Sequence, residues 1–187
     1  MNVVKTAVWQ QWNNVGLEYL ELIERNPIDG IVIESTVIGF EDKTPFHLRY
    51  RLRCLENYQV IRVVISLSGH QSLDLTRLAT GQWLDEHNQH LPQLEGCHDI
   101  DISATPFTNT LPIRRLDWQV GQSRSLDMVY IRIPDLTIER ATQQYTCLEK
   151  HERGSVFEYS QPGFKAILPI DSDGFVQNYP ELFRRLS

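Results

Sequence analysis

A strict alternation of apolar and cationic residues constrains the fold of this chain more than any other feature. Within PFHLRYRLRCLE, every second side chain is apolar or aromatic, and three arginines fall between them at Arg49, Arg51 and Arg53. A period of two places the arginines on one face of an extended strand, whereas a helix would spread them around its circumference. The run therefore predicts a β-strand with one buried face and one solvated face.

The same period recurs along the chain, in VIRVVISLS, SLDLTRL, LDMVYIRIP, LTIERATQQYTCLE, SVFEYS and FKAILPID. Short segments rich in Gly, Pro, Asn and Asp separate these runs and leave no room for crossover helices. We therefore expect an all-β, antiparallel sheet that closes or half-closes into a barrel, with little helix. Two segments leave helix open: GLEYLELIER fits either period, and PELFRRLS could form one turn that begins at Pro180.

One strand departs from the alternation. The run Gly30–Phe40, GIVIESTVIGF, is apolar on both sides at its ends, which predicts apolar contacts on both faces of that strand. Another strand, a helix or a bound apolar ligand could cover its second face.

Length, charge and cysteine usage narrow the class of protein. A chain of 187 residues with 41% hydrophobic residues fits one domain, 1–187, better than two. A net charge of −6 disfavours nucleic acid as a partner unless a basic patch is segregated on one face. No apolar run is long enough to span a membrane, and the start, MNVVKTAVWQQWNN, lacks the features of a secretory signal, so we expect a cytoplasmic location. Three distant cysteines predict reduced, packed thiols.

The segment CHDIDISATPFTNTLPIRRL concentrates polar chemistry. Asp99 and Asp101 share one face if the segment begins as a strand, and such a pair could act as the two carboxylates of a glycoside hydrolase. Pairing with Arg114 or Arg115 would instead brace the segment, and only one of these adjacent arginines could readily reach the aspartates. Pro106 and Pro112 forbid ordinary ladder pairing and predict an irregular but rigid loop. In a binding interpretation, an aspartate, Asn109 or an arginine faces a cavity and holds sugar hydroxyls or an anionic head group.

Other polar and aromatic residues have a functional and a structural interpretation. His87 and His90 could join His98 and the two aspartates around a metal, but no known zinc spacing is matched, and we expect solvated histidines and neither metal nor cofactor. The arginine stripe is either a solvated strand face or the wall of a site for anionic ligands. Trp83 and Trp118 could offer flat surfaces to sugar rings or pack in the core.

The run Gly96–Leu116 resembles the most distinctive motif of a bacterial family of putative glycolipid-binding proteins, formerly a domain of unknown function. Supporting pieces follow in the family's order over nearly the whole chain: Trp9, Gly16-Leu17-Glu18, Pro45 through Tyr50, Gly81-Gln82-Trp83, Leu94-Glu95-Gly96-Cys97, Pro134, Gln143-Gln144-Tyr145-Thr146 and the region from Asp171 to Tyr179. The resemblance implies an incompletely closed antiparallel β-barrel similar to the carriers of lipoprotein acyl chains in the bacterial envelope.

The resemblance also implies a function. We expect a noncatalytic protein that binds a glycolipid or another amphipathic small molecule in the concave face of the half-open barrel. The residues we assign to its polar rim are Asp99, Asp101, Asn109, Arg114 and Arg115. Two alternatives stay open: a hydrolase that acts on a sugar or lipid conjugate through Asp99 and Asp101, and an interaction module that uses an exposed strand edge.

Overall fold

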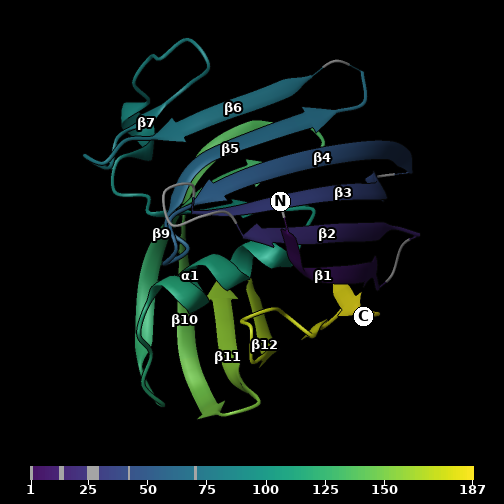
Figure 1. Ribbon diagram of the computed structural model, residues 1–187, viewed down its shortest axis with the longest axis vertical. Helices are drawn as coiled ribbons and strands as arrows, with labels where there is room; N and C mark the ends of the chain where they lie inside the picture. Colours follow the sequence, from purple (N-terminus) through teal and green to yellow (C-terminus); the bar gives the residue numbers. More distant parts are fainter. Residues whose placement is uncertain (1, 13–14, 25–29, 42, 70) are drawn as a thin grey trace.

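The structure, a computed structural model, describes residues 2–12, 15–24, 30–41, 43–69 and 71–187. Two β-sheets face each other, and the one α-helix among these residues, α1 (Thr110–Arg115), lies between them (Figure 1).

The larger sheet has nine strands in the order β13-β14-β1-β2-β3-β4-β5-β6-β7. Seven of them follow one another along the chain: β1 (Asn2–Gln11), β2 (Leu17–Glu24), β3 (Ile31–Glu41), β4 (Thr44–Cys54), β5 (Val60–Leu67), β6 (Ser72–Arg77) and β7 (Trp83–Leu84). Two short strands from the end of the chain, β13 (Asn178–Tyr179) and β14 (Phe183–Arg185), extend the sheet beyond β1. All of these pairs are antiparallel, as the sequence predicts.

The smaller sheet has five strands in the order β12-β11-β10-β9-β8. Its strands are β8 (Asp99–Ile102), β9 (Ser123–Arg132), β10 (Thr137–His151), β11 (Gly154–Gln161) and β12 (Phe164–Asp171). No backbone ladder joins the two sheets in the described residues, so the predicted incomplete closure of the barrel is confirmed. The other pairs of this sheet are antiparallel, which confirms the predicted fold class, and the one parallel pair, β8–β9, is an addition that the sequence did not predict.

The parallel pair explains where the helical residues lie. Parallel neighbours need a crossover connection, and here the crossover consists of a 3₁₀ turn (Phe107–Asn109) and α1. A further 3₁₀ turn, Pro92–Leu94, precedes β8. The prediction of an irregular loop was therefore wrong for this segment. Pro112 is the third residue of α1, where its missing N–H would have no partner within the helix in any case.

The two segments that left helix open are extended. The described part of GLEYLELIER forms β2, and PELFRRLS forms a turn followed by β14. At the chain end, pairing with β1 in the register Trp9↔Arg185 and Gln11↔Phe183 supplies backbone partners that an isolated helical turn would lack.

The core lies between the sheets. On β4 all five apolar positions from Phe46 to Cys54 are buried and the three arginines are exposed, which confirms the predicted alternation. At the centre, Phe107 from the crossover packs edge-on against Phe175 at a ring separation of 5.4 Å, and Trp9 lies 6.0 Å from the same ring. On β3 three consecutive apolar residues, Ile31–Ile33, are buried, whereas Ile38 is 58% exposed, so contacts on both faces occur only at the beginning of that strand.

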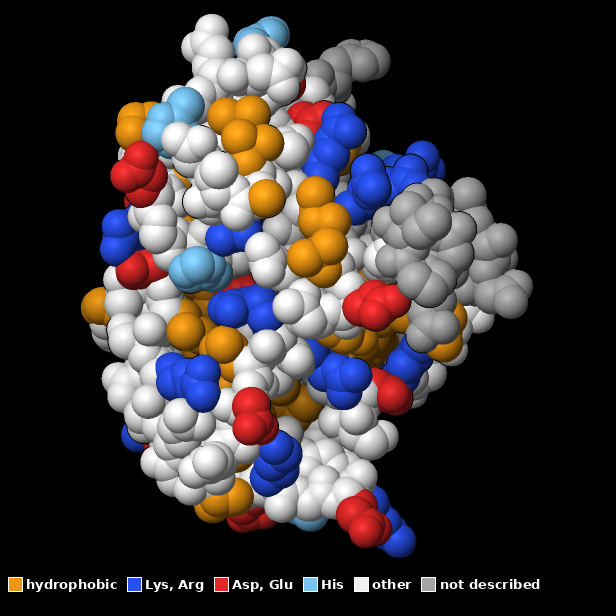
Figure 2. Space-filling view, turned by 60° about the vertical axis from the view of Figure 1, so that its left-hand side comes forward, with side chains coloured by type: hydrophobic (Ala, Val, Ile, Leu, Met, Phe, Trp, Pro, Cys, Tyr) orange, Lys and Arg blue, Asp and Glu red, His pale blue; other side chains and the backbone are white. Residues whose placement is uncertain are grey.

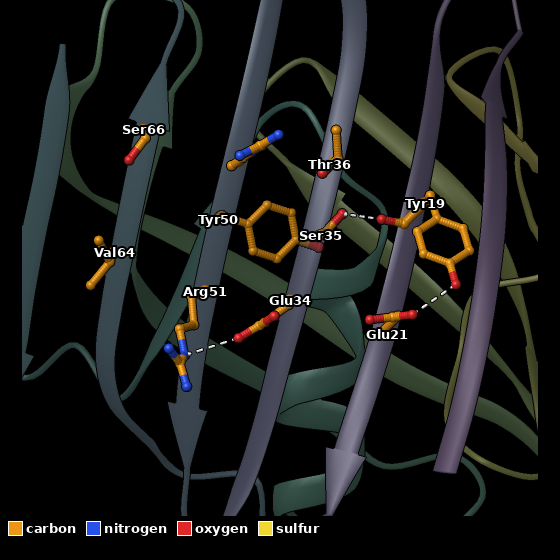
Figure 3. Close-up of a pocket in the computed structure, with 10 residues that line it drawn as sticks. Tyr19, Glu21, Glu34, Ser35, Thr36, Tyr50, Arg51, Val64 and Ser66 are labelled. Atoms are coloured by element: carbon orange, nitrogen blue, oxygen red, sulfur yellow. Dashed lines mark hydrogen bonds and ion pairs between the residues drawn. The ribbon is translucent and has the colours of Figure 1, made fainter. Parts of the chain in front are cut away.

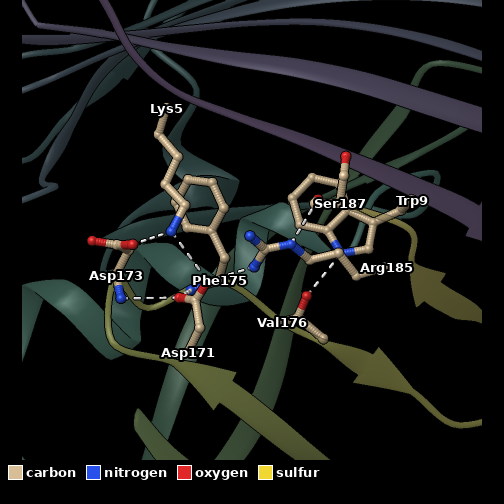
Figure 4. Close-up of polar contacts among 8 residues, drawn as sticks. All are labelled: Lys5, Trp9, Asp171, Asp173, Phe175, Val176, Arg185 and Ser187. Atoms are coloured by element: carbon tan, nitrogen blue, oxygen red, sulfur yellow. Dashed lines mark hydrogen bonds and ion pairs between the residues drawn. The ribbon is translucent and has the colours of Figure 1, made fainter. Parts of the chain in front are cut away.

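Side-chain contacts link the two sheets on the side of the C-terminus. Asp171, at the end of β12, accepts hydrogen bonds from Lys5 on β1 and Arg185 on β14, and Lys5 also pairs with Asp173 (Figure 4). The indole N–H of Trp9 donates to the carbonyl oxygen of Val176 at 2.8 Å. Burial alone would raise the pKa of the Asp171 carboxyl, but the hydrogen bonds from the two cations and from a backbone N–H outweigh it and lower that pKa. These contacts join the edges of the two sheets without a ladder.

The three cysteines, Cys54, Cys97 and Cys147, are buried free thiols, which confirms the prediction of reduced, packed cysteines.

Candidate functional site: an aromatic cleft between the sheets

The run Gly96–Leu116, called the signature segment from here on, enters the space between the sheets at β8, where Ile100 and Ile102 are fully buried. Asp99 is also fully buried and forms a bidentate ion pair with Arg115 at the end of α1, with atom separations of 2.9 Å and 2.5 Å. Both carboxylate oxygens are therefore held by one guanidinium group. The predicted bracing contact exists, and Arg115 is the arginine that makes it.

Arg114 points elsewhere, because adjacent residues of a helix differ by about 100° in direction. Its guanidinium lies 5.2 Å from the centre of the Tyr58 ring, and its side chain passes close to Gly174. Arg114 lines a separate hollow of about 220 Å³ beside Trp118. The structure thus does not bring Arg114 to the two aspartates.

Among the described residues, Asp101 has neutral hydrogen-bond partners only. Its oxygens accept hydrogen bonds from Thr108 Oγ1 at 2.9 Å and from Gln143 Nε2 at 2.6 Å. Burial raises the pKa of the Asp101 carboxyl, and these two hydrogen bonds offset part of the rise. Because a carboxylate can accept about four hydrogen bonds, Asp101 retains unused acceptor capacity.

Asn109 lies at the junction of the 3₁₀ turn and α1. Its amide donates to the carbonyl oxygen of Pro106 at 3.0 Å and its Oδ1 accepts from the hydroxyl of Tyr145 at 2.8 Å. The local bond to Pro106 fixes the turn, and the bond to Tyr145 on β10 ties the crossover to the smaller sheet.

Asp101 and Asn109 lie in the wall of a cleft of about 180 Å³ that both sheets enclose. The polar part of the wall also contains Ser103, Thr105 and Gln161. The apolar part contains Ile102, Leu182 and five aromatic side chains: Tyr130, Tyr159, Phe164, Tyr179 and Phe183. The rings of Tyr159, Phe164 and Tyr179 lie about 6.1 Å from one another, so they form a continuous aromatic surface.

The cleft holds one ionisable acid among neutral phenols. Burial raises the pKa of Tyr159 and Tyr179, and burial together with the charge of Asp101 raises that of Tyr130. These hydroxyls are therefore protonated hydrogen-bond donors at neutral pH. Such a surface suits an uncharged ligand that has hydroxyl groups on its edge and C–H groups on its face.

A second buried acid is connected to the cleft through Thr105. Glu18 Oε1 accepts hydrogen bonds from Tyr50 at 2.6 Å and from Ser35 at 2.8 Å, and the Tyr50 hydroxyl lies 3.3 Å from Thr105 Oγ1. Burial raises the pKa of Glu18 to about 7, against the opposing effect of hydroxyl hydrogen bonds from Thr105, Tyr50 and Ser35. Its Oε2 atom is buried and has no hydrogen-bond partner in the described part of the chain.

The tryptophans and histidines that the sequence analysis singled out lie outside the cleft. Trp83 and Trp118 are buried, and their indole N–H groups donate to backbone carbonyls of Cys97 and Pro112, so the core-packing interpretation is correct for both. His87, His90 and His98 are all exposed to solvent. His87 lies beside Glu86, His90 lies beside Glu95, and His98 contacts Arg77 at 3.1 Å. Within the described ranges, no three His, Cys, Asp or Glu side chains are placed to hold a metal ion.

The aromatic residues of the cleft escaped the sequence analysis, although three of them belong to runs with clear alternation. They come from five strands, β9 and β11–β14, and periodicity in one strand does not show which residues of another lie opposite. The available signal was the density of tyrosine and phenylalanine in YIRIP, SVFEYS and QNYPELF.

The molecular surface gives no sign of a segregated basic region on the face in Figure 2, where Lys and Arg side chains are scattered among Asp and Glu. Over the residues that the structure describes, the helices are all too short or too polar to cross a bilayer.

Taken together, the fold and the cleft define a two-sheet β protein with an aromatic cleft of about 180 Å³ between its sheets. The sequence profile of the family described as "Putative glycolipid-binding" matches residues 6–185, and the chain belongs to this family. A crystal structure of a DUF1089 family protein from Pseudomonas aeruginosa is similar, with a TM-score of 0.78 and 33% identity over 90% of this chain and 92% of that one. No curated protein matches the chain.

Proposed function

We propose that this protein binds a glycolipid without catalysing a reaction of it, and that the aromatic cleft receives the sugar head group. The observation that carries the proposal is the combination of five aromatic side chains with Asp101 and Asn109 around one cavity. A sugar ring has apolar C–H faces, which pack on aromatic rings, and hydroxyl groups at its edge, which bond to carboxylate and amide groups. The family description supports the same ligand class.

The size of the cleft decides which part of the ligand it takes. Its volume of about 180 Å³ is below the roughly 300 to 1,000 Å³ of cavities that enclose drug-sized ligands. Elsewhere the concave space between the sheets holds core side chains such as Trp9, Phe107 and Phe175. The cleft therefore takes one head group rather than a complete acyl chain.

The acyl chains have an apolar route away from the cleft. Leu182 belongs to the cleft wall and is 40% exposed, and its carbonyl oxygen accepts a hydrogen bond from the backbone N–H of Trp12, which is 48% exposed. Each methylene buried against such a surface contributes about 0.8 kcal/mol, so a partly covered chain adds substantially to the affinity of the sugar.

Hydrolysis through Asp99 and Asp101 is less well supported by the same contacts. The two oxygens of Asp99 are both engaged by Arg115, away from the cleft, and only Asp101 belongs to the cleft wall. A pair of carboxylates that flank one bond is therefore missing at this position, and we retain binding as the proposed function.

Two-dimensional amide NMR titration of the full chain with octyl glucoside below its micelle concentration tests the proposal. We expect shifts centred on β9, β11 and β12, weaker binding of glucose, and no comparable shifts with octanoate. Phe164→Ala should weaken binding about tenfold, because it removes part of the ring surface. Phe40→Ala, an exposed aromatic on the other sheet, is the matched control. Shifts that avoid the cleft, or equal binding by Phe164→Ala, would refute the assignment.

A further inference from the structure

A second hollow lies on the outer face of the nine-stranded sheet, across β2 to β5, and has a volume of about 360 Å³ (Figure 3). The register places Tyr19, Thr36, Arg49 and Ser66 side by side across four strands. The next row is Glu21, Glu34, Arg51 and Val64. Short side chains at Thr36, Ser66 and Val64 form the low part of the groove, and the longer residues form its walls.

The charges of this outer groove are only partly matched. Arg51 Nε lies 3.3 Å from Glu34 Oε1, and both side chains are almost half exposed, so this ion pair contributes little. Glu21 lies directly opposite Glu34, and its one hydrogen-bond donor in the described residues is the Tyr19 hydroxyl at 2.8 Å. The Arg49 side chain makes no ion pair or hydrogen bond with any described residue.

We propose that the outer groove binds a hydroxylated ring that carries one anionic group, such as a sugar acid or a sugar phosphate. Arg49 holds the anion, since a free guanidinium offers paired donors to a carboxylate or phosphate. The ring packs on Tyr19, and its hydroxyls donate to Glu21 or Glu34 and bond to Thr36 and Ser66. This site is independent of the aromatic cleft, which lies between the sheets rather than on the outer face.

The arginine stripe of the sequence gives the experiment its control. Arg53 is exposed on the same face of β4 as Arg49, but lies opposite Arg62 and outside the groove. Arg49→Ala and Arg53→Ala therefore remove the same charge from the same strand and differ in whether the groove loses a donor. Both residues are exposed, so neither variant disturbs the core.

Amide NMR titration of the full chain with glucuronate, glucose 6-phosphate, glucose and inorganic phosphate tests the proposal. We expect glucuronate or glucose 6-phosphate to shift residues of β2–β5, glucose to bind at least tenfold more weakly, and the better of the two anions to identify the anionic group. Arg49→Ala should lose about tenfold in affinity and Arg53→Ala less than twofold. The proposal would be overturned by equal losses in the two variants or by the absence of shifts in the groove. It would also be overturned if glucose bound as tightly as either anion, or if inorganic phosphate bound as tightly as glucose 6-phosphate. Phe164→Ala should leave this binding unchanged, which separates the result from that of the cleft.

Discussion

Glu18 is the residue whose titration should control the stability of the fold near neutral pH. The carboxyl is buried between the sheets, and its pKa is about 7 instead of 4.5. Between these two pH values the folded chain holds a proton that the unfolded chain has lost. The free energy of unfolding therefore falls as the pH rises from about 4.5 to 7. Above pH 7 it stays lower by the full free-energy cost of burying the ionised carboxylate.

The size of the effect follows from the two pKa values. A rise from 4.5 to about 7, at 1.36 kcal/mol per pKa unit, corresponds to about 3 kcal/mol. For a domain of this size, 1 kcal/mol shifts Tm by roughly 2–4 °C, so the contribution of Glu18 is roughly 6–12 °C between low and high pH.

Glu18→Gln removes the titration while keeping an acceptor for Tyr50 and Ser35. The new amide N–H groups occupy the position of Oε2, which has no partner in the described residues, and this costs about 1–3 kcal/mol at every pH. The informative quantity is thus the difference in free energy of unfolding between the two proteins, followed as a function of pH. Other titrating groups are common to both and cancel in that difference.

Urea denaturation at pH 5, 6, 7 and 8 measures this difference. We expect Glu18→Gln to gain about 2.5 kcal/mol relative to the natural chain between pH 5 and pH 8, because at pH 5 the unfolded chain has already lost part of its proton. Glu21→Gln, on the opposite face of the same strand, reports how much of the change comes from loss of a negative charge alone. A difference that stays constant over this pH range would show that Glu18 does not titrate in the folded state as argued.

Three further predictions concern the crossover helix, the link between the sheets and the β10–β11 turn. Arg115→Ala should cost about 3–5 kcal/mol in urea denaturation, because it leaves Asp99 buried and unpaired, whereas Arg114→Ala should cost about 1 kcal/mol or less. Asp171→Asn should lower the free energy of unfolding near pH 6, where the ionised carboxylate of the natural chain stabilises the fold. The difference between the two proteins should shrink towards pH 3, because the stabilisation is lost as the pH falls below 3.8 and through the lowered pKa of the folded state. A difference that stays constant over this range would contradict the prediction. Gly154→Ala should lower Tm, because its φ is +146° and a Cβ atom would meet a carbonyl oxygen of β12 at 2.1 Å; an unchanged Tm would show that the β10–β11 turn can relax.

The alternating runs predicted the strands because each has one face against the core and one in solvent. The β4 run is the clearest case, and its arginines lie outside as expected. Periodicity could not detect β13 and β14, which have two and three residues. These strands depend on long-range pairing, of β14 with β1 and of β13 with β14. Nor could periodicity show that β8 pairs in parallel with β9, because the direction of a partner strand leaves no trace in the alternation.

Part of the candidate site was predicted, because some of its residues stand out within one segment of the sequence. Asp101 and Asn109 stood out as polar residues in an unusual segment, and both belong to the cleft wall. The sequence predicted that only one of Arg114 and Arg115 could reach the aspartates, but it did not show which one. The helical geometry of α1 directs Arg115 to Asp99. Whether any of these residues contacts a ligand stays a prediction.

The position of the signature segment accounts for its density of polar residues. It carries the crossover between two parallel strands through the space between the sheets, where water cannot satisfy an irregular backbone. Thr105 and Asn109 therefore bond to local backbone groups, and Asp99 neutralises the arginine that ends the helix. Because the same segment supplies Asp101 from β8 and Asn109 from the 3₁₀ turn to the cleft, the contacts that allow the crossover to be buried also fix the polar wall at which a sugar would bind. Loss of the Asp99–Arg115 pair should thus weaken ligand binding as well as stability, although neither residue belongs to the cleft wall.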